Sequence, residues 1–254
     1  MSHYYLAEKL KNRHTSAGKL VWIMPLLVVV LAGLLTGDYF TIDCYNWWYT
    51  ILFPGMTAFL CGGIGERDKK LGNRAVWTLP ADMGAVWDGK ILAGIRYMGI
   101  SLLVLVSMVL AVSFVFEWIL HSVFRISLTP GQQLLAVLVL FITSIWQIPF
   151  CLFVQQAAGT FPMVLLHVGS FMLCDTMLSL KPYFMVLPGG IPARMMCILL
   201  KILPNGLVAE PGSITYTPEL MEWQGLPLGI VASIVWFLIF WRLSRKWFER
   251  KVED

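Results

Sequence analysis

Six long runs of apolar residues follow one another along the chain, and polar stretches separate them. A helix needs about 20 mostly apolar residues to cross ~30 Å of hydrocarbon, and the runs are close to that length. The pattern therefore predicts an all-α polytopic membrane protein with six transmembrane helices. The predicted spans are Leu20–Thr36, Trp47–Gly63, Ile91–Ile119, Gln132–Val154, Phe161–Leu180 and Leu226–Trp241.

The longest polar interruption in the first half of the chain is the segment from Glu66 to Lys90, between the second and third predicted spans. Lys and Arg outnumber Asp and Glu there, which places the segment on the cytoplasmic side. From Asn73 to Asp88, large apolar residues alternate with polar ones, and Pro80 marks a start or a break. This favours a short amphipathic helix at the membrane surface. A solvated loop whose charges only set the topology is the alternative.

Two other segments outside the spans carry apolar residues. In residues 3–19, apolar positions three and four apart share one face, which predicts an interfacial helix on the inner leaflet. A frayed, charged tail is the alternative. The segment from Lys181 to Gly225 is rich in proline, yet Ala193–Leu203 is apolar and too short to cross the bilayer. We expect short helices in the outer leaflet there, with an ordinary outer loop as the alternative.

Composition and charge support this topology. The chain is 58% hydrophobic and 13% charged, whereas a soluble domain is roughly 25% charged. All Lys and Arg residues fall in segments expected inside, except Arg125, Lys181, Arg194 and Lys201. This bias predicts cytoplasmic termini and one transmembrane domain over residues 1–254. The basic residues form no continuous patch, so nucleic acid is not an expected partner.

Sequence motifs exclude several kinds of chemistry. No GxxxxGK[ST], HExxH or GxSxG sequence occurs, so neither an ATP site nor a common hydrolase site is indicated. The five cysteines lack the CxxC spacing of a metal or redox site, and a Cys44–Cys197 disulfide is the one pairing to consider.

Ionisable residues within spans are functional candidates, because burying a charge in lipid is costly. Asp175 and His167 lie about two turns apart on one face of the fifth span. Asp175 is expected to face a cavity or a partner chain, and His167 is more often a packing residue. Glu117 lies near the outer end of the third span.

Short motifs across the chain resemble those of type-2 ABC exporter permeases, in particular the lantibiotic-immunity branch of the MutE/EpiE kind. Glu66-x-x-Lys69-x-x-x-Asn73, then Leu79-Pro80, then Lys90-Ile91 carry the resemblance in the loop. The N-terminal sequence YLAEKLK and the sequence LPNGL before the last span are similar to that branch as well. The residues Asp88-Gly89 before Lys90 depart from the expected pattern.

The resemblance implies a role for each part of the chain. The loop would dock on a pair of cytosolic ATPase subunits that bind ATP and Mg²⁺, while this chain binds no cofactor and is not an enzyme. A second, homologous permease subunit would complete a transporter that expels a lantibiotic peptide from a bacterial cell membrane. The implied docking residues are Glu66, Lys69, Asn73, Arg74, Trp77, Leu79, Pro80, Trp87 and Lys90. The residues expected along the substrate path are Asp175, His167 and Glu117.

Three other interpretations stay open. The chain could be a type-2 permease for another amphipathic cargo, such as a drug or a lipid. It could also be an intramembrane enzyme, which would need ionisable groups converging on one pocket. A membrane scaffold is the third.

Overall fold

The computed structural model describes residues 2–12, 15–69, 81–119, 121, 124 and 126–253. Helices dominate these ranges, and the only β pairing within them is an isolated bridge between Ile202 and Val208. The all-α prediction is confirmed.

Six helical stretches in the described ranges are long and apolar enough to cross a membrane. All six predicted spans are therefore confirmed, and the protein is a multi-pass membrane protein. The helices that make up these stretches are α2 (Ser16–Leu35), α3 (Phe40–Trp47) with α4 (Phe53–Lys69), α6 (Met83–Trp118), α7 (Pro130–Ser144) with α8 (Gln147–Ala158), α9 (Thr160–Leu173) and α11 (Gly225–Glu253).

The helices extend beyond the predicted spans at several ends. The expected outer loop after the first span is itself helical, with η1 (Gly37–Tyr39) leading into α3. On the other side of the second span, α4 continues to Lys69. The loop expected from Glu66 to Lys90 is therefore helical at both ends.

The third spanning helix begins earlier than expected. Asp82 caps α6, because its carboxylate accepts a hydrogen bond from the backbone N–H of Ala85 at 3.1 Å. At 36 residues, α6 is about 54 Å long and exceeds the hydrocarbon thickness. The prediction of a separate surface helix from Asn73 to Asp88 is therefore wrong for residues 83–88, which belong to α6. Residues 73–80 of that predicted helix lie outside the described ranges.

Two of the spanning stretches contain a π-helical turn, a wider turn with one residue more than an α-helical turn. The first, Trp48–Leu52, joins α3 to α4, and the second, Cys174–Leu178, ends α9. Pro54 lies two residues beyond the end of the first π turn. Because proline donates no backbone hydrogen bond, the ladder is interrupted at the same place.

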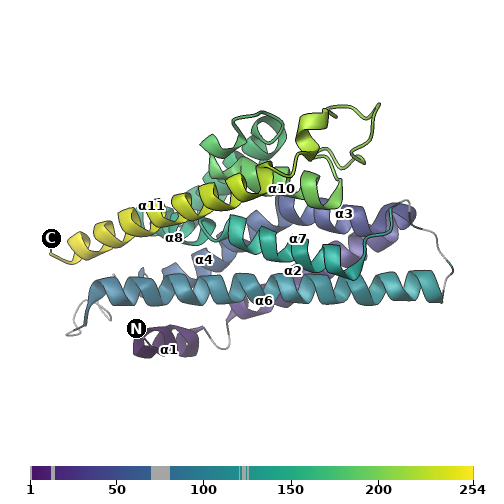
Figure 1. The fold of residues 1–254 in the computed structure, drawn as a ribbon. Helices are drawn as coiled ribbons and strands as arrows, with labels where there is room; N and C mark the ends of the chain where they lie inside the picture. The colour runs from purple at the N-terminus through teal and green to yellow at the C-terminus, as the bar shows by residue number, and fades with distance from the viewer. Residues whose placement is uncertain are drawn as a thin grey trace.

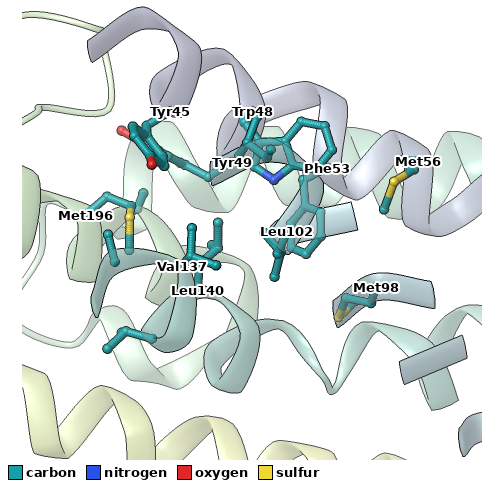
Figure 2. Close-up of a cluster of buried hydrophobic side chains, with 14 of the residues drawn as sticks. Tyr45, Trp48, Tyr49, Phe53, Met56, Met98, Leu102, Val137, Leu140 and Met196 are labelled. Carbon is teal, nitrogen blue, oxygen red and sulfur yellow. The ribbon is translucent and has the colours of Figure 1, made fainter. Parts of the chain in front are cut away.

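A cluster of large side chains joins the second, third and fourth spanning stretches (Figure 2). The residues of this buried cluster that Figure 2 labels are Tyr45, Trp48, Tyr49, Phe53, Met56, Met98, Leu102, Val137, Leu140 and Met196. Met196 comes from α10 (Ile191–Leu200), in which every residue is buried. The short helix expected in the outer leaflet therefore lies inside the protein, where side chains of its own chain cover it.

The N and C termini lie at the same end of the helical assembly (Figure 1). We call this end, which contains α1 (Ser2–Lys11), the start of α6 and the end of α11, the terminal end. The helix α1 packs against α6, and it turns its polar face inward. Glu8 and Asn12 are buried, while Leu6 and Leu10 are exposed. The predicted N-terminal helix is present, with its apolar face free for the membrane.

Candidate functional site

A cluster of four charged side chains joins α1, α4 and α6 at the terminal end, and we call it the loop base. It consists of Glu8, Lys11, Asp68 and Lys90. The ammonium of Lys90 forms an ion pair with Asp68 and lies 3.3 Å from Glu8. Lys11 lies 2.9 Å from Glu8 and 3.3 Å from Asp68. Two carboxylates and two ammonium groups thus alternate, and their formal charges cancel.

The loop base is largely withdrawn from solvent. The side chain of Lys90 is 1% exposed and that of Glu8 is 3% exposed. Half-burial works against the charge of Lys11, but the carboxylates of Glu8 and Asp68 outweigh it and raise the pKa of Lys11 above its ordinary 10.5. A buried charge is costly unless it is paired, so the members of the loop base depend on one another.

The C-terminal end of α4 is also tied to the turn between α8 and α9. The Lys69 ammonium donates to the backbone carbonyls of Gln155 and Gln156 at 3.0 and 3.1 Å. These carbonyls belong to the last turn of α8, where a cation is favoured by the helix dipole. Thr160 at the start of α9 donates to the Glu66 carboxylate at 3.2 Å.

The start of α6 is held by the polar C-terminal end of α11. The indole N–H of Trp87 donates to Ser244 Oγ at 2.9 Å, and its ring stacks on Phe248 with centroids 4.7 Å apart. The neighbouring Asp88 accepts from the indole of Trp241 at 2.6 Å and lies 3.5 Å from the Arg245 guanidinium. Aromatic stacking and paired charges therefore fix the angle between the two helices.

These contacts place several predicted docking residues inside the chain. Trp87 and Lys90 were expected to face an ATPase, but both are buried against other helices of this protein. Glu66 and Lys69 are half-buried and bind the α8–α9 turn. The remaining docking residues lie outside the described ranges: Asn73, Arg74, Trp77, Leu79 and Pro80.

Asp175 does not face a cavity as expected. Its side chain is fully buried in the second π turn, and both carboxylate oxygens lack a hydrogen-bond partner among the described residues. A nearby cavity of about 220 Å³ is lined by apolar side chains, including Trp146, Phe171 and Trp236, and does not include Asp175. Side chains of the same chain thus cover this carboxyl group.

His167 is a packing residue with one polar contact. Its Nε2 lies 3.1 Å from Gln147 Oε1, and the ring sits within 6 Å of the rings of Trp146, Phe150 and Phe171. His167 and Asp175 share the buried face of the fifth spanning stretch, as their spacing predicted. No hydrogen bond joins them in the described structure, so they do not form an acid–base pair.

Glu117 is exposed near the C-terminal end of α6, far along that helix from the loop base. The Cys44–Cys197 disulfide considered from the sequence is not formed, since both thiols are free and buried. Within the described ranges, no group of three or more His, Cys, Asp or Glu side chains could hold a metal ion.

Comparison of the chain with protein-family models, curated proteins and solved structures finds no match. The sequence did not predict the contacts that Glu8, Asp68, Ser244 and Phe248 form at the terminal end. The only local signal was Glu8 and Lys11 three residues apart on the polar face of a helix. The loop base is the arrangement from which function is argued below.

Proposed function

We propose that this chain is the permease subunit of a bacterial ABC transporter that expels a lantibiotic-type antimicrobial peptide from the membrane. One observation carries the proposal. The buried Asp68–Lys90 ion pair joins α4 and α6, the two helices that flank the segment implied to dock on the ATPase. A partner that moves this segment would therefore move two spanning helices together.

The surrounding contacts would spread such a movement further. Lys69 ties α4 to the last turn of α8, and Trp87 ties α6 to α11. A push on the loop would thus reach four spanning stretches. Cytosolic ATPase subunits would bind ATP and Mg²⁺ and supply the push, because this chain lacks a phosphate-binding loop of its own.

The exposed apolar surface of α11 suits a second permease subunit or lipid. Several large apolar side chains of this helix are exposed. They include Leu228, Val231, Val235, Leu238 and Leu243. In the proposed transporter, the substrate path would run between this chain and the second subunit.

The acidic residues expected on that path differ in what they offer a cationic peptide. Glu117 is exposed, so it could contact a cationic peptide without any movement of α6. Asp175 is covered and would reach the path only if the end of α9 moved. An amphipathic drug or lipid as cargo is the alternative within the same architecture. The intramembrane-enzyme interpretation is weaker, because His167 and Asp175 do not converge on one pocket of the described structure.

The test joins a biochemical and a physiological readout. The full-length chain is purified from its native membranes, and co-purifying subunits are identified and assayed for vanadate-sensitive ATP hydrolysis. We expect a subunit with a Walker motif, and we expect cells lacking the chain to become more sensitive to a lantibiotic. Absence of such a subunit, together with unchanged peptide sensitivity, would refute the proposal. A Walker subunit with unchanged lantibiotic sensitivity would instead favour another cargo.

A further inference from the structure

A groove at the terminal end lies between α1, α2 and α6 and has a volume of about 980 Å³. Three basic side chains line it, one from each helix: Lys9, Lys19 and Arg96. Leu6 and Leu10 form its apolar wall. No acidic residue belongs to this lining among the described residues, so the groove combines positive charge with apolar surface.

The three basic residues of the groove have no acidic partner in the described ranges. Each is exposed, and none forms an ion pair within the part of the chain that the structure describes. Lys11 on the same helix as Lys9 is the contrast, because it is engaged in the loop base. The Arg96 guanidinium lies 5.9 Å from the ring of Tyr97, and the Tyr97 hydroxyl donates to the Asn12 carbonyl at 3.2 Å.

The position of the groove along the helices matches the level of lipid headgroups. Trp22, which follows Lys19 by one turn of α2, is 58% exposed. Exposed tryptophans are enriched where a spanning helix leaves the hydrocarbon. Beyond Trp22, α2 exposes Ile23, Leu26 and Leu27. The groove thus opens onto a surface that acyl chains cover in a membrane.

We propose that this groove binds the headgroup of an anionic phospholipid. The phosphate would lie among Lys9, Lys19 and Arg96, and the acyl chains would run along α2 past Trp22. Basic pockets between membrane helices bind anionic headgroups in this manner. The charge of the groove argues against a preference for a zwitterionic lipid, since no carboxylate of the described lining meets a choline or ethanolamine group.

Such a lipid would contact three helices and would hold α1 against the spans. The backbone of Tyr4 lies so close to α6 that a Cβ atom on Gly89 would come within 3.1 Å of it. The docking of α1 therefore depends on close backbone contact and the loop base on one side, and on the lipid on the other. The inference needs only that the protein is embedded in a membrane, and it does not depend on the proposed transport activity.

The experiment compares two double variants of equal charge change in neutral detergent. K19Q/R96Q removes two groove cations, and R242Q/K246Q removes two exposed cations of α11 that form no ion pair among the described residues. Phosphatidylglycerol or phosphatidylcholine with matched acyl chains is added. Bound lipid is measured by native mass spectrometry, and thermal stability by a melting curve.

We expect phosphatidylglycerol, but not phosphatidylcholine, to remain bound to the wild-type protein and to raise its melting temperature. K19Q/R96Q should bind phosphatidylglycerol about 30-fold more weakly, equivalent to ~1 kcal/mol per cation. R242Q/K246Q should bind it as the wild type does. If K19Q/R96Q aggregates, R96Q and R242Q are compared instead.

Three results would overturn the inference. Equal binding of phosphatidylcholine would show that charge does not select the lipid. Unchanged binding by K19Q/R96Q would place the lipid elsewhere. The same stabilisation by inorganic phosphate alone would show a site for free anions rather than for a lipid.

Discussion

Lys90 on α6 and Asp68 on α4 form a buried ion pair that closes the base of the segment between these helices. The two residues are 22 positions apart in sequence, so the pair acts as a non-covalent clasp between two spanning helices. Glu8 of α1 contacts the same ammonium group and joins a third helix to the clasp.

Replacing Lys90 with Met should destabilise the protein by about 3 kcal/mol, because two buried carboxylates lose a partner. Melting curves in detergent measure the loss. K246M is the matched control, since Lys246 is exposed and forms no ion pair among the described residues. In K90M/D68L much of the loss should be recovered, because apolar replacement of a buried pair is often neutral. Equal melting temperatures for K90M and K246M would contradict the assigned role of the pair.

Trp87 and Leu79 should behave differently when each is changed to Asp, although both were predicted to bind an ATPase. W87D buries a carboxylate, removes the stack on Phe248 and breaks the bond to Ser244. It should cost about 4 kcal/mol or more. Under the proposed function, L79D should abolish recovery of the ATPase.

A melting curve and a pull-down on each variant separate the two roles. Wild-type stability of W87D would contradict the packing of Trp87 against α11. Full ATPase recovery with L79D would count against docking through this loop.

Gly89→Leu should release α1 from α6. A Cβ atom at position 89 would approach the Tyr4 carbonyl carbon to 3.1 Å and its oxygen to 3.2 Å, and backbone atoms cannot move aside singly. Trypsin cleavage after Lys9 and Lys11 should become faster. Gly169→Leu is the control, since a Cβ atom there meets nothing within 4 Å. Equal cleavage of both variants would show that α1 does not need this close approach.

Asp175→Asn should raise the melting temperature by a few degrees. The carboxyl group has no hydrogen-bond partner among the described residues. Keeping a buried carboxyl group uncharged at neutral pH costs free energy that a neutral amide of similar size does not require. Under the proposed function, the same variant should give weaker protection against the peptide, because functional groups are often retained at a cost in stability. A lower melting temperature would show that the carboxylate has a stabilising partner.

Periodicity and hydropathy were sufficient to predict the spans, because each span must bury its backbone polar groups in a helix and show lipid an apolar surface. The N-terminal helix followed from its spacing in the same way. The helical ends of the loop could not be predicted from hydropathy. There, Asp68 and Lys90 look like solvated charges until tertiary pairing removes both from water.

The candidate site was harder to predict for a related reason. Trp87 is a large aromatic residue at a position where a docking residue was expected. The sequence alone does not show whether it contacts another protein or, as in the structure, α11. Asp175 was expected to face a cavity or a partner chain, whereas side chains of its own chain bury it. The burial of its carboxyl group could not be predicted. Hydropathy assigned the proline-rich segment after the fifth span to the membrane surface, but residues Pro188–Leu200 of that segment are buried within the protein.

Within the described ranges, the π turns at Trp48–Leu52 and Cys174–Leu178 are two places where the chain can lose a residue without disturbing its helices. Since each holds one residue beyond an α-helical turn, a one-residue deletion inside it would restore regular helix and leave both flanking parts in phase. Deletion of the half-exposed Ile51 should accordingly preserve the fold. The same deletion within α6 would rotate every later side chain of that helix by about 100° and turn its inward face towards the lipid.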